Sequence, residues 1–455
     1  MSIKNLNIVI LAAGKGTRMQ SVMPKVLHRL AGKPLLAHVI DAAKALNPNK
    51  MVVVYGYGGD AVPKAFTHED IAWVEQKEQL GTGHAVLQAV PNLDDDGTTL
   101  ILLGDVPLLN LQSCKSLLEK TEALGLLTVS KQNPTGYGRI VRDEKKQIIA
   151  IIEHKDATDV QRAIAEVNTG IIAVNNKKLK AWLSKLSNQN AQGEYYLTDI
   201  VAMAVNDGLN VAAEITQDEA SVEGVNSKVD LANLERVYQT RYATSLMQAG
   251  ATLADPNRID VRGHLTVGKD VEIDVGCVFE GQVTLGNGVR VGPYCVIKDS
   301  TIGEGSVIAA YTHIDEARVE SNCRLGPYAR LRPGAEIANE AHVGNFVEIK
   351  NSQVGRSSKV NHLSYIGDAT IGKNVNIGAG TITCNYDGVN KYKTVIEDDV
   401  FIGSDTQLVA PVVIGEGATI AAGSTITKNA PAGQLTFCRA KDQKSIAGWK
   451  RPIKK

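Results

Sequence analysis

A short glycine loop surrounded by cations is the first segment of the chain whose residues are suited to chemistry. Residues 6–11 are apolar except for Asn7, as in a buried parallel strand, and lead into the run 12–19, Ala-Ala-Gly-Lys-Gly-Thr-Arg-Met, and then Pro24-Lys25. Small residues let the backbone pass close to a ligand, and N–H groups ahead of a helix favour phosphate. Lys15, Arg18 and Lys25 add positive charge. The loop is neither a Walker loop nor a dinucleotide fingerprint, because position 19 is methionine.

A carboxylate follows a second apolar run, residues 99–103, which continues as Gly104-Asp105. We expect this run to be a strand whose carboxyl end lies at the crevice where open α/β sheets bind ligands. Asp105 is either a helix cap or turn residue there, or a ligand of Mg²⁺. The second interpretation is chemically reasonable because a hard cation that bridges phosphates typically takes one or two protein oxygens.

The second half of the chain repeats an aliphatic residue at every sixth position from Val261 to Ile426. Four steps are one residue short, and glycine often follows the aliphatic. A six-residue step is too long for a helical turn and too regular for independent strands. It therefore predicts a solenoid of short strands, with stacked aliphatics inside and glycine-assisted corners. If three hexads form a coil, Cys277 and Cys295 stack on neighbouring coils, where we expect buried free thiols rather than a disulfide.

Departures from this repeat are candidate functional sites. Thirteen residues separate Thr383 from Ile396 where six would suffice, so part of this segment must leave the coil as a loop. His362 lies off the stacked aliphatic position, with Asn345 at the equivalent place one coil earlier. The same arithmetic puts Glu348 beside Tyr365, so we expect all four side chains on one face. His362 is either incidental or a neutral imidazole suited to taking a proton from an attacking amine.

Composition limits the classes of partner. The chain has 455 residues with 49 basic and 49 acidic side chains, so no bulk field draws it to nucleic acid or to anionic lipid. No apolar run is long enough to span a membrane, and we expect a cytoplasmic protein. The six cysteines form no CxxC pair and no zinc spacing.

Helical spacing of apolar residues marks the joint between the two halves, with Gly250 as a stop signal. The sequence therefore predicts an α/β domain over 1–227, a helical linker over 228–250, a solenoid domain over 251–437 and a tail over 438–455. The helix either joins the domains or packs back on the first one.

The run from Gly14 to Met19 with Pro24-Lys25 resembles the sugar-nucleotide pyrophosphorylases, which implies a Rossmann-like nucleotidyltransferase fold. Residues 76–85 match the uracil-reading region of that family, and 136–139, 153 and 168–170 match its sugar pocket. Residues 194–199 complete the pattern, and Asn226 matches its second oxygen ligand for Mg²⁺. The chemistry implied is in-line attack of a sugar 1-phosphate on a nucleoside triphosphate with loss of pyrophosphate, where positioning and charge neutralisation carry the rate.

The hexad repeat resembles the left-handed parallel β-helix of hexapeptide-repeat acyltransferases. With the segments 344–348 and 384–388, the whole chain resembles the bacterial bifunctional N-acetylglucosamine-1-phosphate uridyltransferase/glucosamine-1-phosphate acetyltransferases. The resemblance implies that the β-helix acetylates glucosamine 1-phosphate from acetyl-CoA. The first domain then couples N-acetylglucosamine 1-phosphate to UTP, with Mg²⁺ as cofactor, and gives UDP-N-acetylglucosamine for the cell envelope. It also implies a homotrimer whose acetyl-transfer sites are shared between subunits.

The same resemblance implies roles for individual residues. His362 would be the general base of acetyl transfer, Arg18 and Lys25 would act in uridylyl transfer, and Asp105 and Asn226 would hold the metal. The residues implied to bind UDP-N-acetylglucosamine are Leu11, Ala12, Ala13, Gly14, Lys25, Gln76, Gly81, Thr82, Leu103, Gly104, Asp105, Gly138, Glu153, Asn168 and Asn226. Those implied to bind glucosamine 1-phosphate are Arg332, Lys350, Tyr365, Asn376 and Lys391, and those implied for acetyl-CoA are Asn385, Tyr386, Ser404, Ala422 and Arg439.

Two other functions are compatible with the same architecture. One is a single-activity sugar-nucleotide pyrophosphorylase whose β-helix is structural or regulatory. The other makes the solenoid a trimerisation scaffold alone. His362 and the Asn385-Tyr386 loop favour the bifunctional interpretation, because neither alternative requires them.

Overall fold

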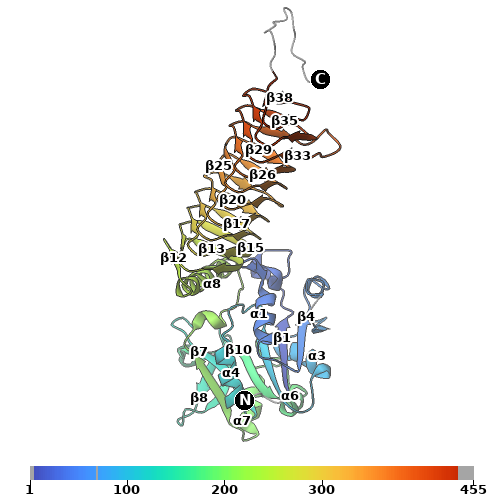
Figure 1. Ribbon diagram of the computed structural model, residues 1–455. Helices are drawn as coiled ribbons and strands as arrows, with labels where there is room; N and C mark the ends of the chain where they lie inside the picture. The colour runs from blue at the N-terminus through green and yellow to red at the C-terminus, as the bar shows by residue number, and fades with distance from the viewer. Residues whose placement is uncertain (1–4, 68–69, 439–455) are drawn as a thin grey trace, which may run out of the picture. The chain divides into compact units, whose positions relative to one another are not determined.

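The computed structural model describes residues 5–67 and 70–438, and the chain folds into two compact units that divide between Tyr238 and Gln239. The division falls inside the long helix α8 (Lys228–Gln248), within the predicted linker. Figure 1 shows the labelled elements of both units. Over the described ranges, no helix combines the length and the apolar character needed to cross a bilayer.

The first unit is built on a mostly parallel sheet in the strand order β11-β7-β10-β6-β1-β4-β5. Its strands are β1 (Leu6–Ala12), β4 (Lys50–Tyr55), β5 (Ala72–Glu75), β6 (Thr98–Leu103), β7 (Leu124–Ser130), β10 (Glu166–Asn175) and β11 (Val211–Thr216), with β8 (Arg139–Arg142) and β9 (Ile148–Ile152) added beside β10. β1 pairs in parallel with both β4 and β6, and β10 runs antiparallel. Chain order therefore reverses at β1, which confirms the predicted α/β fold and places a ligand crevice at its carboxyl end.

Helices cover the sheet, and the longer ones bury one apolar face each. They are α1 (Leu35–Lys44), α2 (Ala61–Lys64), α3 (Thr82–Ala89), α4 (Leu111–Lys120), α5 (Asp159–Arg162), α6 (Asn176–Leu183) and α7 (Asp199–Asn206). Short 3-10 turns are η1 (Thr17–Met19), η2 (Lys25–Leu27), η3 (Val90–Asn92) and η4 (Glu219–Val222), and β2 (Arg29–Leu30) pairs with β3 (Lys33–Pro34). α4 begins where the side chain of Asn110 accepts hydrogen bonds from two backbone N–H groups, as an N-cap residue does.

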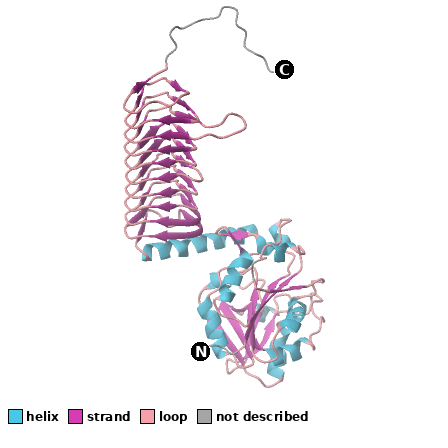
Figure 2. Cartoon of the chain, turned by 45° about the vertical axis from the view of Figure 1, so that its right-hand side comes forward, coloured by secondary structure: helices cyan, strands magenta, loops and turns pink. Residues whose placement is uncertain are grey.

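The second unit is a parallel β-helix, as predicted (Figure 2). Each regular coil gives one strand to an eleven-stranded sheet: β12 (Ala251–Leu253), β14 (Val271–Ile273), β16 (Arg290–Val291), β19 (Val307–Ile308), β22 (Arg324–Leu325), β25 (His342–Asn345), β28 (Lys359–His362), β31 (Asn376–Ile377), β34 (Phe401–Ile402), β37 (Thr419–Ile420) and β39 (Leu435–Thr436). The other two faces form one seventeen-stranded sheet: β13 (Ile259–Val267), β15 (Cys277–Leu285), β17 (Val296–Lys298), β18 (Thr301–Ile302), β20 (His313–Asp315), β21 (Arg318–Val319), β23 (Arg330–Leu331), β24 (Glu336–Ile337), β26 (Glu348–Lys350), β27 (Gln353–Val354), β29 (Tyr365–Gly367), β30 (Ala369–Ile371), β32 (Ile382–Cys384), β33 (Thr394–Ile396), β35 (Gln407–Val409), β36 (Val412–Ile414) and β38 (Thr425–Ile426).

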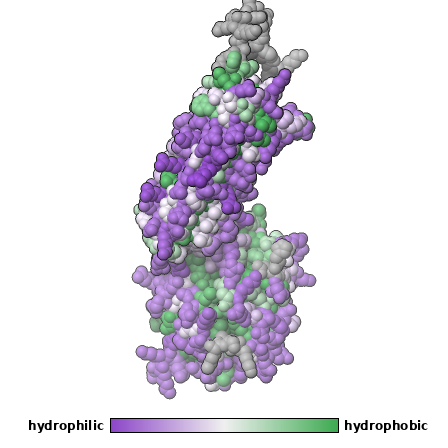
Figure 3. All heavy atoms as spheres, in the orientation of Figure 1, coloured by the Kyte–Doolittle hydropathy of each residue, from purple (hydrophilic) through white to green (hydrophobic). Residues whose placement is uncertain are grey.

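The aliphatic repeat points inward throughout the β-helix. Residues such as Ile297, Ile314 and Leu331 stack on successive coils in register and are fully buried. Figure 3 shows mainly hydrophilic residues on the visible β-helix surface, as this inward stacking requires. Cys277 and Cys295 are buried free thiols on neighbouring coils, which confirms the expectation.

The glycines that follow the aliphatics, among them Gly268, Gly286 and Gly403, lie directly before the corners but mostly lack a left-handed backbone. Of the predicted set only Gly326 has a left-handed backbone. The others let adjacent coils approach: a Cβ on Gly344 would lie 2.1 Å from the carbonyl oxygen of Asn361. The left-handed corner positions are held partly by larger residues such as Tyr311 and Asp368 and partly by other glycines such as Gly288 and Gly334.

Helix α8 closes the first coil of the β-helix through Gln239. Its buried side-chain amide donates to the carbonyl oxygen of Val261 over 2.9 Å and accepts from the N–H of Val261 over 2.8 Å. Leu246 from the same helix belongs to the β-helix core, whereas Leu234 belongs to the core of the first unit. The helix therefore contributes to both cores, so it does not merely pack back on the first domain.

Candidate active sites

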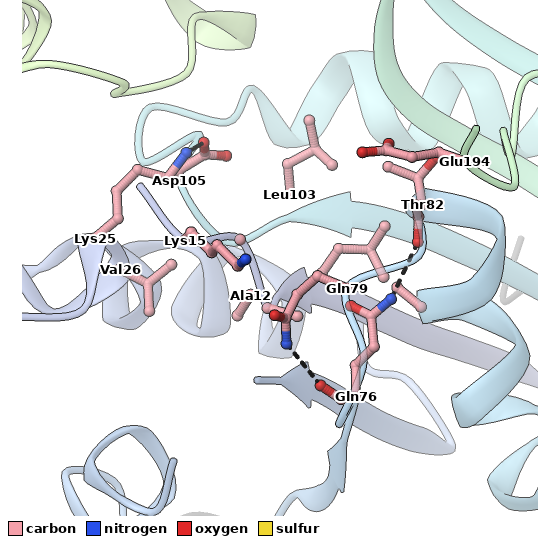
Figure 4. A pocket seen from close by; sticks show the side chains of 15 residues that line it. Ala12, Lys15, Lys25, Val26, Gln76, Gln79, Thr82, Leu103, Asp105 and Glu194 are labelled. Carbon is pink, nitrogen blue, oxygen red and sulfur yellow. Dashed lines mark hydrogen bonds and ion pairs between the residues drawn. The ribbon is translucent and has the colours of Figure 1, made fainter. Parts of the chain in front are cut away.

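A cavity of about 480 Å³ opens at the carboxyl ends of β1 and β6 (Figure 4). It is lined by Leu11, Ala12, Ala13, Gly14, Lys15, Lys25, Val26, Gln76, Gln79, Gly81, Thr82, Ala85, Leu103, Asp105 and Glu194. Most of the predicted nucleotide-binding residues are therefore brought together at one place. Val26 was not among the predictions, and its position next to Lys25 is the only sequence signal that could have indicated it.

The glycine loop differs from the expectation in one respect. It does not run into an α-helix, because η1 is a single 3-10 turn and α1 starts only at Leu35. The loop therefore offers lysines and an exposed Gly14, rather than an α-helix N-terminus, to the predicted phosphate ligand. Arg18 lies exposed in η1 and is outside the set of cavity-lining residues.

Lys25 connects the two predicted metal ligands. Its ammonium group makes a short hydrogen-bonded ion pair with Oδ2 of Asp105 (Figure 4). It also donates to Oδ1 of Asn226 over 3.2 Å. Both charged side chains are largely buried, with 13% of the Lys25 and 17% of the Asp105 side chain exposed. Two oxygens from positions far apart in the sequence thus converge on one cation.

The orientation of Asn226 is set by its own neighbours. Its Nδ2 donates to the carbonyl oxygen of Gly224 over 3.3 Å, so Oδ1 faces Lys25. The carboxylate of Asp230 accepts from the N–H groups of Asn226 and Ser227 and holds this segment at the start of α8. Across residues 5–67 and 70–438, no group of three or more His, Cys, Asp or Glu could hold a metal alone. A Mg²⁺ ion bound by one carboxylate, one amide and substrate phosphates fits this donor set.

The predicted uracil-reading region forms the far wall of the cavity. Gln76 is only 3% exposed, and its Nε2 donates to the carbonyl oxygen of Gly81 over 3.1 Å and lies 3.0 Å from Nδ1 of His84. Gln79 donates in turn to the carbonyl oxygen of Gln76. A buried amide whose position is set by several hydrogen bonds is suited to recognising the polar edge of a base.

The predicted sugar-pocket residues also meet. The N–H of Asn168 donates to the carbonyl oxygen of Gly138 over 2.9 Å, and a Cβ on Gly138 would lie 3.3 Å from Oε1 of Glu153. Burial is the main cause that raises the pKa of Glu153, whereas the hydrogen bond that Thr198 donates to its carboxylate lowers this pKa in part. Gly104, the remaining predicted residue here, packs against Leu11, whose carbonyl oxygen accepts its N–H.

In the β-helix, the predicted general base His362 belongs to a row of equivalent positions on successive coils. Asn345 pairs with His362 on the next coil, as expected, and the same register places Ala379, Ser404 and Ala422 two residues after the buried aliphatics of later coils. His362, Ser404 and Ala422 are exposed. Adjacent positions in such a row are about 4.8 Å apart, so a long ligand could run along it. Ala379, which was not among the predicted residues, occupies an equivalent position in this row by the hexad register.

Glu348 and Tyr365 are neighbours as predicted, but they do not share a face with Asn345 and His362. The first pair belongs to the seventeen-stranded sheet and the second to the eleven-stranded sheet. The two faces meet at the corner that contains Phe346 and Leu363, which both have left-handed backbones. The expectation of one common face is therefore wrong, because a turn of the coil intervenes.

Three cations were predicted to bind the acceptor phosphate, and they lie on strands or loops of the seventeen-stranded sheet. Arg332 donates to Oε1 of Glu348 over 2.7 Å, and Nζ of Lys350 lies 3.5 Å from Oδ2 of Asp368. The hydrogen bond and charge of Lys350 are the main causes that lower the pKa of Lys391. Lys391 lines one cavity with Asp368, which is the partner of Lys350. Asn376 is not brought to them, because β31 belongs to the eleven-stranded sheet.

The loop between β32 and β33 projects from the β-helix (Figure 2). Asn385 at its base is 7% exposed, whereas Tyr386 is 59% exposed. Tyr386 pairs with Lys391 across the loop, and the side chain of Asp387 accepts the N–H groups that form its tip. Arg439, the last candidate for acetyl-CoA, lies outside the described residues.

Comparison with protein families assigns both units to transferases. The MobA-like NTP transferase domain matches residues 8–168, and the Bacterial transferase hexapeptide (six repeats) family matches residues 264–299 and 393–428. The chain is therefore a transferase with two catalytic parts, a nucleotidyltransferase domain followed by a hexapeptide-repeat acyltransferase domain. Its relatives define it more narrowly, because they match it over the whole length.

Three relatives carry the name Bifunctional protein GlmU. The protein of Methylobacillus flagellatus is 67% identical over 449 residues, which cover 99% of this chain and 98% of the relative. Those of Nitrosospira multiformis and Herminiimonas arsenicoxydans are 58% and 59% identical and cover 100% and 99% of this chain, with 99% of each relative. The chain belongs to the family of bifunctional GlmU proteins, with a uridyltransferase in the first domain and an acetyltransferase in the β-helix.

Proposed function

We propose that the first domain joins UTP to N-acetylglucosamine 1-phosphate in the cavity at the ends of β1 and β6. The convergence of Asp105 and Asn226 on the ammonium of Lys25 is the observation that carries this proposal. Asp105 and Asn226 would hold Mg²⁺, which supplies charge neutralisation to the triphosphate. Lys25, released from this pair, and Arg18 from η1 would stabilise negative charge that develops as pyrophosphate leaves.

The walls of the cavity suit the two ends of the product. Gln76, Gly81 and Thr82 would contact the uracil base, because a buried amide with fixed hydrogen bonds discriminates the polar edge of a base. Gly138, Glu153 and Asn168 would contact the sugar; this is supported by the hydrogen bond between the backbones of Gly138 and Asn168 and by the proximity of Glu153.

The β-helix would acetylate glucosamine 1-phosphate with His362 as general base. The exposed imidazole is free to meet a substrate amine, since its side chain is not buried among the described residues. Arg332, Lys350 and Lys391 would bind the acceptor phosphate, because clustered cations match its charge. Tyr365 would contact the sugar beside them. Asn385, Tyr386, Ser404 and Ala422 would contact acetyl-CoA, with the exposed row along the β-helix as its path.

We further propose that the enzyme is a homotrimer with shared acetyl-transfer sites. A row of apolar corner residues supports this: Tyr294, Tyr311, Tyr328 and Phe346 stack with ring centroids 5.0 to 5.3 Å apart, and Leu363 continues the row. These side chains are 44% to 62% exposed, and an apolar ridge of this length on a solenoid is expected to be covered by another surface. A closed ring of three copies would cover it in every subunit.

The distribution of the candidates also supports shared sites. Within one chain His362 and Asn376 lie on the eleven-stranded sheet, whereas Lys350 and Tyr365 lie on the other. In a trimer the eleven-stranded sheet of one subunit would face the seventeen-stranded sheet of its neighbour. Since UTP and acetyl-CoA are intracellular metabolites, we propose that this enzyme acts in the cytoplasm.

Complementation between variants tests the shared site. At a low concentration of glucosamine 1-phosphate, His362→Ala alone should abolish acetyl transfer and Lys350→Ala alone should reduce it by raising the KM, but co-expressed chains should exceed the mean activity of the two variants if the two residues come from different subunits. Each protein should sediment as a trimer. A monomeric mass, or no activity in the mixed preparation, would contradict the proposal.

Product analysis tests the two reactions. Mass spectrometry should detect UDP-N-acetylglucosamine when glucosamine 1-phosphate, acetyl-CoA and UTP are all present. Omission of UTP should leave N-acetylglucosamine 1-phosphate, and omission of acetyl-CoA should leave glucosamine 1-phosphate unmodified. UDP-linked product without acetyl-CoA would contradict the proposed order.

A further inference from the structure

Asp368 occupies a corner of the β-helix between β29 and β30, directly beside the acceptor-phosphate candidates. Its backbone is left-handed, with φ at 50°, and its side chain is 12% exposed. With Lys391 it lines a cavity of about 400 Å³. Neither the repeat nor the resemblance assigned this residue a role.

The carboxylate of Asp368 contacts three side chains from two segments, the neighbours Lys350 and Asn351 and the loop residue Asn385. Oδ1 accepts from Nδ2 of Asn351 over 2.6 Å, on the coil before. Oδ2 lies 3.5 Å from Nζ of Lys350 and accepts a short hydrogen bond from Nδ2 of Asn385. One carboxylate therefore links a residue proposed for the acceptor phosphate to one proposed for acetyl-CoA.

The backbone of Asp368 makes the same connection. Its N–H donates to the carbonyl oxygen of Lys350 over 3.1 Å, and its own carbonyl oxygen accepts from the N–H of Thr394 over 3.2 Å. Thr394 is the residue at which the projecting loop rejoins the coil as β33. Asp368 is thus bonded to both ends of that loop, through Asn385 at its start and Thr394 at its end.

Charge in the cluster also depends on Asp368. The hydrogen bond and charge of Lys350 lower the pKa of Lys391, and the charge of Asp368 is the largest influence that raises this pKa against them. Burial raises the pKa of Asp368 itself, but hydrogen bonds from Asn351 and Asn385 and the charge of Lys350 outweigh it, so the pKa is lowered. The carboxylate is therefore ionised at neutral pH and acts as the fixed counter-charge of the cluster.

We propose that Asp368 is a positioning residue for acetyl transfer, whose carboxylate holds the ammonium of Lys350 and the amide of Asn385 in their working places. The proposal rests on the roles proposed above for Lys350 and Asn385. It follows that one side chain sets the geometry of both substrate pockets, so a change at Asp368 affects the binding of both substrates.

Steady-state kinetics of Asp368→Asn test this inference. Asparagine keeps the shape but removes the charge and presents an N–H group to one of the three donors. We expect the KM for glucosamine 1-phosphate and the KM for acetyl-CoA each to rise about tenfold, as for loss of a hydrogen bond to a charged group. A purely structural role would instead lower the active fraction, and so kcat, with both KM values unchanged.

Asp299→Asn is the matched control. Asp299 occupies the same corner row several coils earlier, also with a left-handed backbone, and its carboxylate accepts from the N–H of Gln282. This variant removes a corner carboxylate away from the cluster and should leave both KM values at the wild-type level. Equal effects of the two substitutions would overturn the proposal.

Single and double variants separate this inference from the proposed function. If Lys350→Ala and Asn385→Ala each raise the KM of their own substrate but Asp368→Asn raises neither, the inference is wrong and the proposed function stands. If Lys350→Ala and Asn385→Ala have no effect, the proposed function itself is wrong. In the Lys350→Ala background, Asp368→Asn should add little to the KM for glucosamine 1-phosphate, since their coupling has already been removed.

Discussion

Replacing Lys25 by methionine is expected to tighten the binding of Mg²⁺ while it removes pyrophosphate release. The ammonium of Lys25 lies between the oxygens of Asp105 and Asn226 that we propose as metal ligands. A divalent ion must displace this ammonium to reach them, so the two cations compete for one position. Methionine preserves the length of the side chain without its charge, and therefore removes the competitor.

The size of the effect follows from the surroundings of the pair. The side chains of Lys25 and Asp105 are 13% and 17% exposed, so solvent screens them only in part. Two unit charges about 4 Å apart attract by about 4 kcal/mol at an effective dielectric constant of about 20. Lost hydration of both groups offsets much of this, which leaves a net of about 1–2 kcal/mol. Mg²⁺ should then bind roughly five- to thirtyfold more tightly to the variant.

Isothermal titration calorimetry with Mg²⁺, in the absence of nucleotide, measures this effect directly. Lys15→Met is the matched control, because Lys15 lines the same cavity but donates to neither oxygen in the described structure. The control should bind Mg²⁺ as the wild type does. Unchanged or weaker binding by the Lys25→Met variant would refute the competition, and normal pyrophosphate release would remove Lys25 from the mechanism.

Three further predictions concern single residues. His362→Ala should lose acetyl transfer by about 10²- to 10⁴-fold, measured as thiol release from acetyl-CoA, and retain uridylyl transfer; loss of both would indicate misfolding instead. Burial raises the pKa of Glu153 above its ordinary value of 4.5, so the stability it contributes is present below that pH and is lost as pH rises through the raised pKa. The gain in melting temperature from Glu153→Gln should therefore grow as pH increases above 4.5, and a constant difference would contradict this. Ile314→Ala removes a fully buried side chain and should destabilise the β-helix by about 2–5 kcal/mol, so that heat inactivates acetyl transfer earlier while uridylyl transfer is unaffected.

The bifunctional assignment argues against the two alternative functions that the sequence left open. A pyrophosphorylase with a regulatory β-helix, or a scaffold alone, would not be expected to match bifunctional relatives at 67% identity over 99% of the chain. The residues that favoured this interpretation from the sequence were His362 and the loop around Asn385. The structure leaves His362 exposed and projects that loop from the coil.

Elements with a strong periodic signal were predictable because burial itself is periodic. The predicted strand 6–11 is β1, and the hexads form stacked coils. Both were predictable because the side chains that face the interior recur along the chain at a regular spacing. Corner geometry was less predictable. Tyr311 and Asp368 adopt left-handed backbones at corners, where the bonding of successive coils compensates for a conformation that glycine would adopt more easily.

The sequence by itself determined the two architectures, since strand ends, hexads and interruptions are local patterns, and its resemblance to a known family implied most of the candidate residues. Only the tertiary structure decided which candidates meet. Lys25 reaches Asn226 across 201 residues, and Asp368 joins Lys350 to Asn385, although no pattern marks either link. His362 and Glu348, which are close in sequence, lie on different faces because a corner intervenes. The physical reason is that side-chain contacts depend on how distant strands are brought side by side, which local periodicity does not contain.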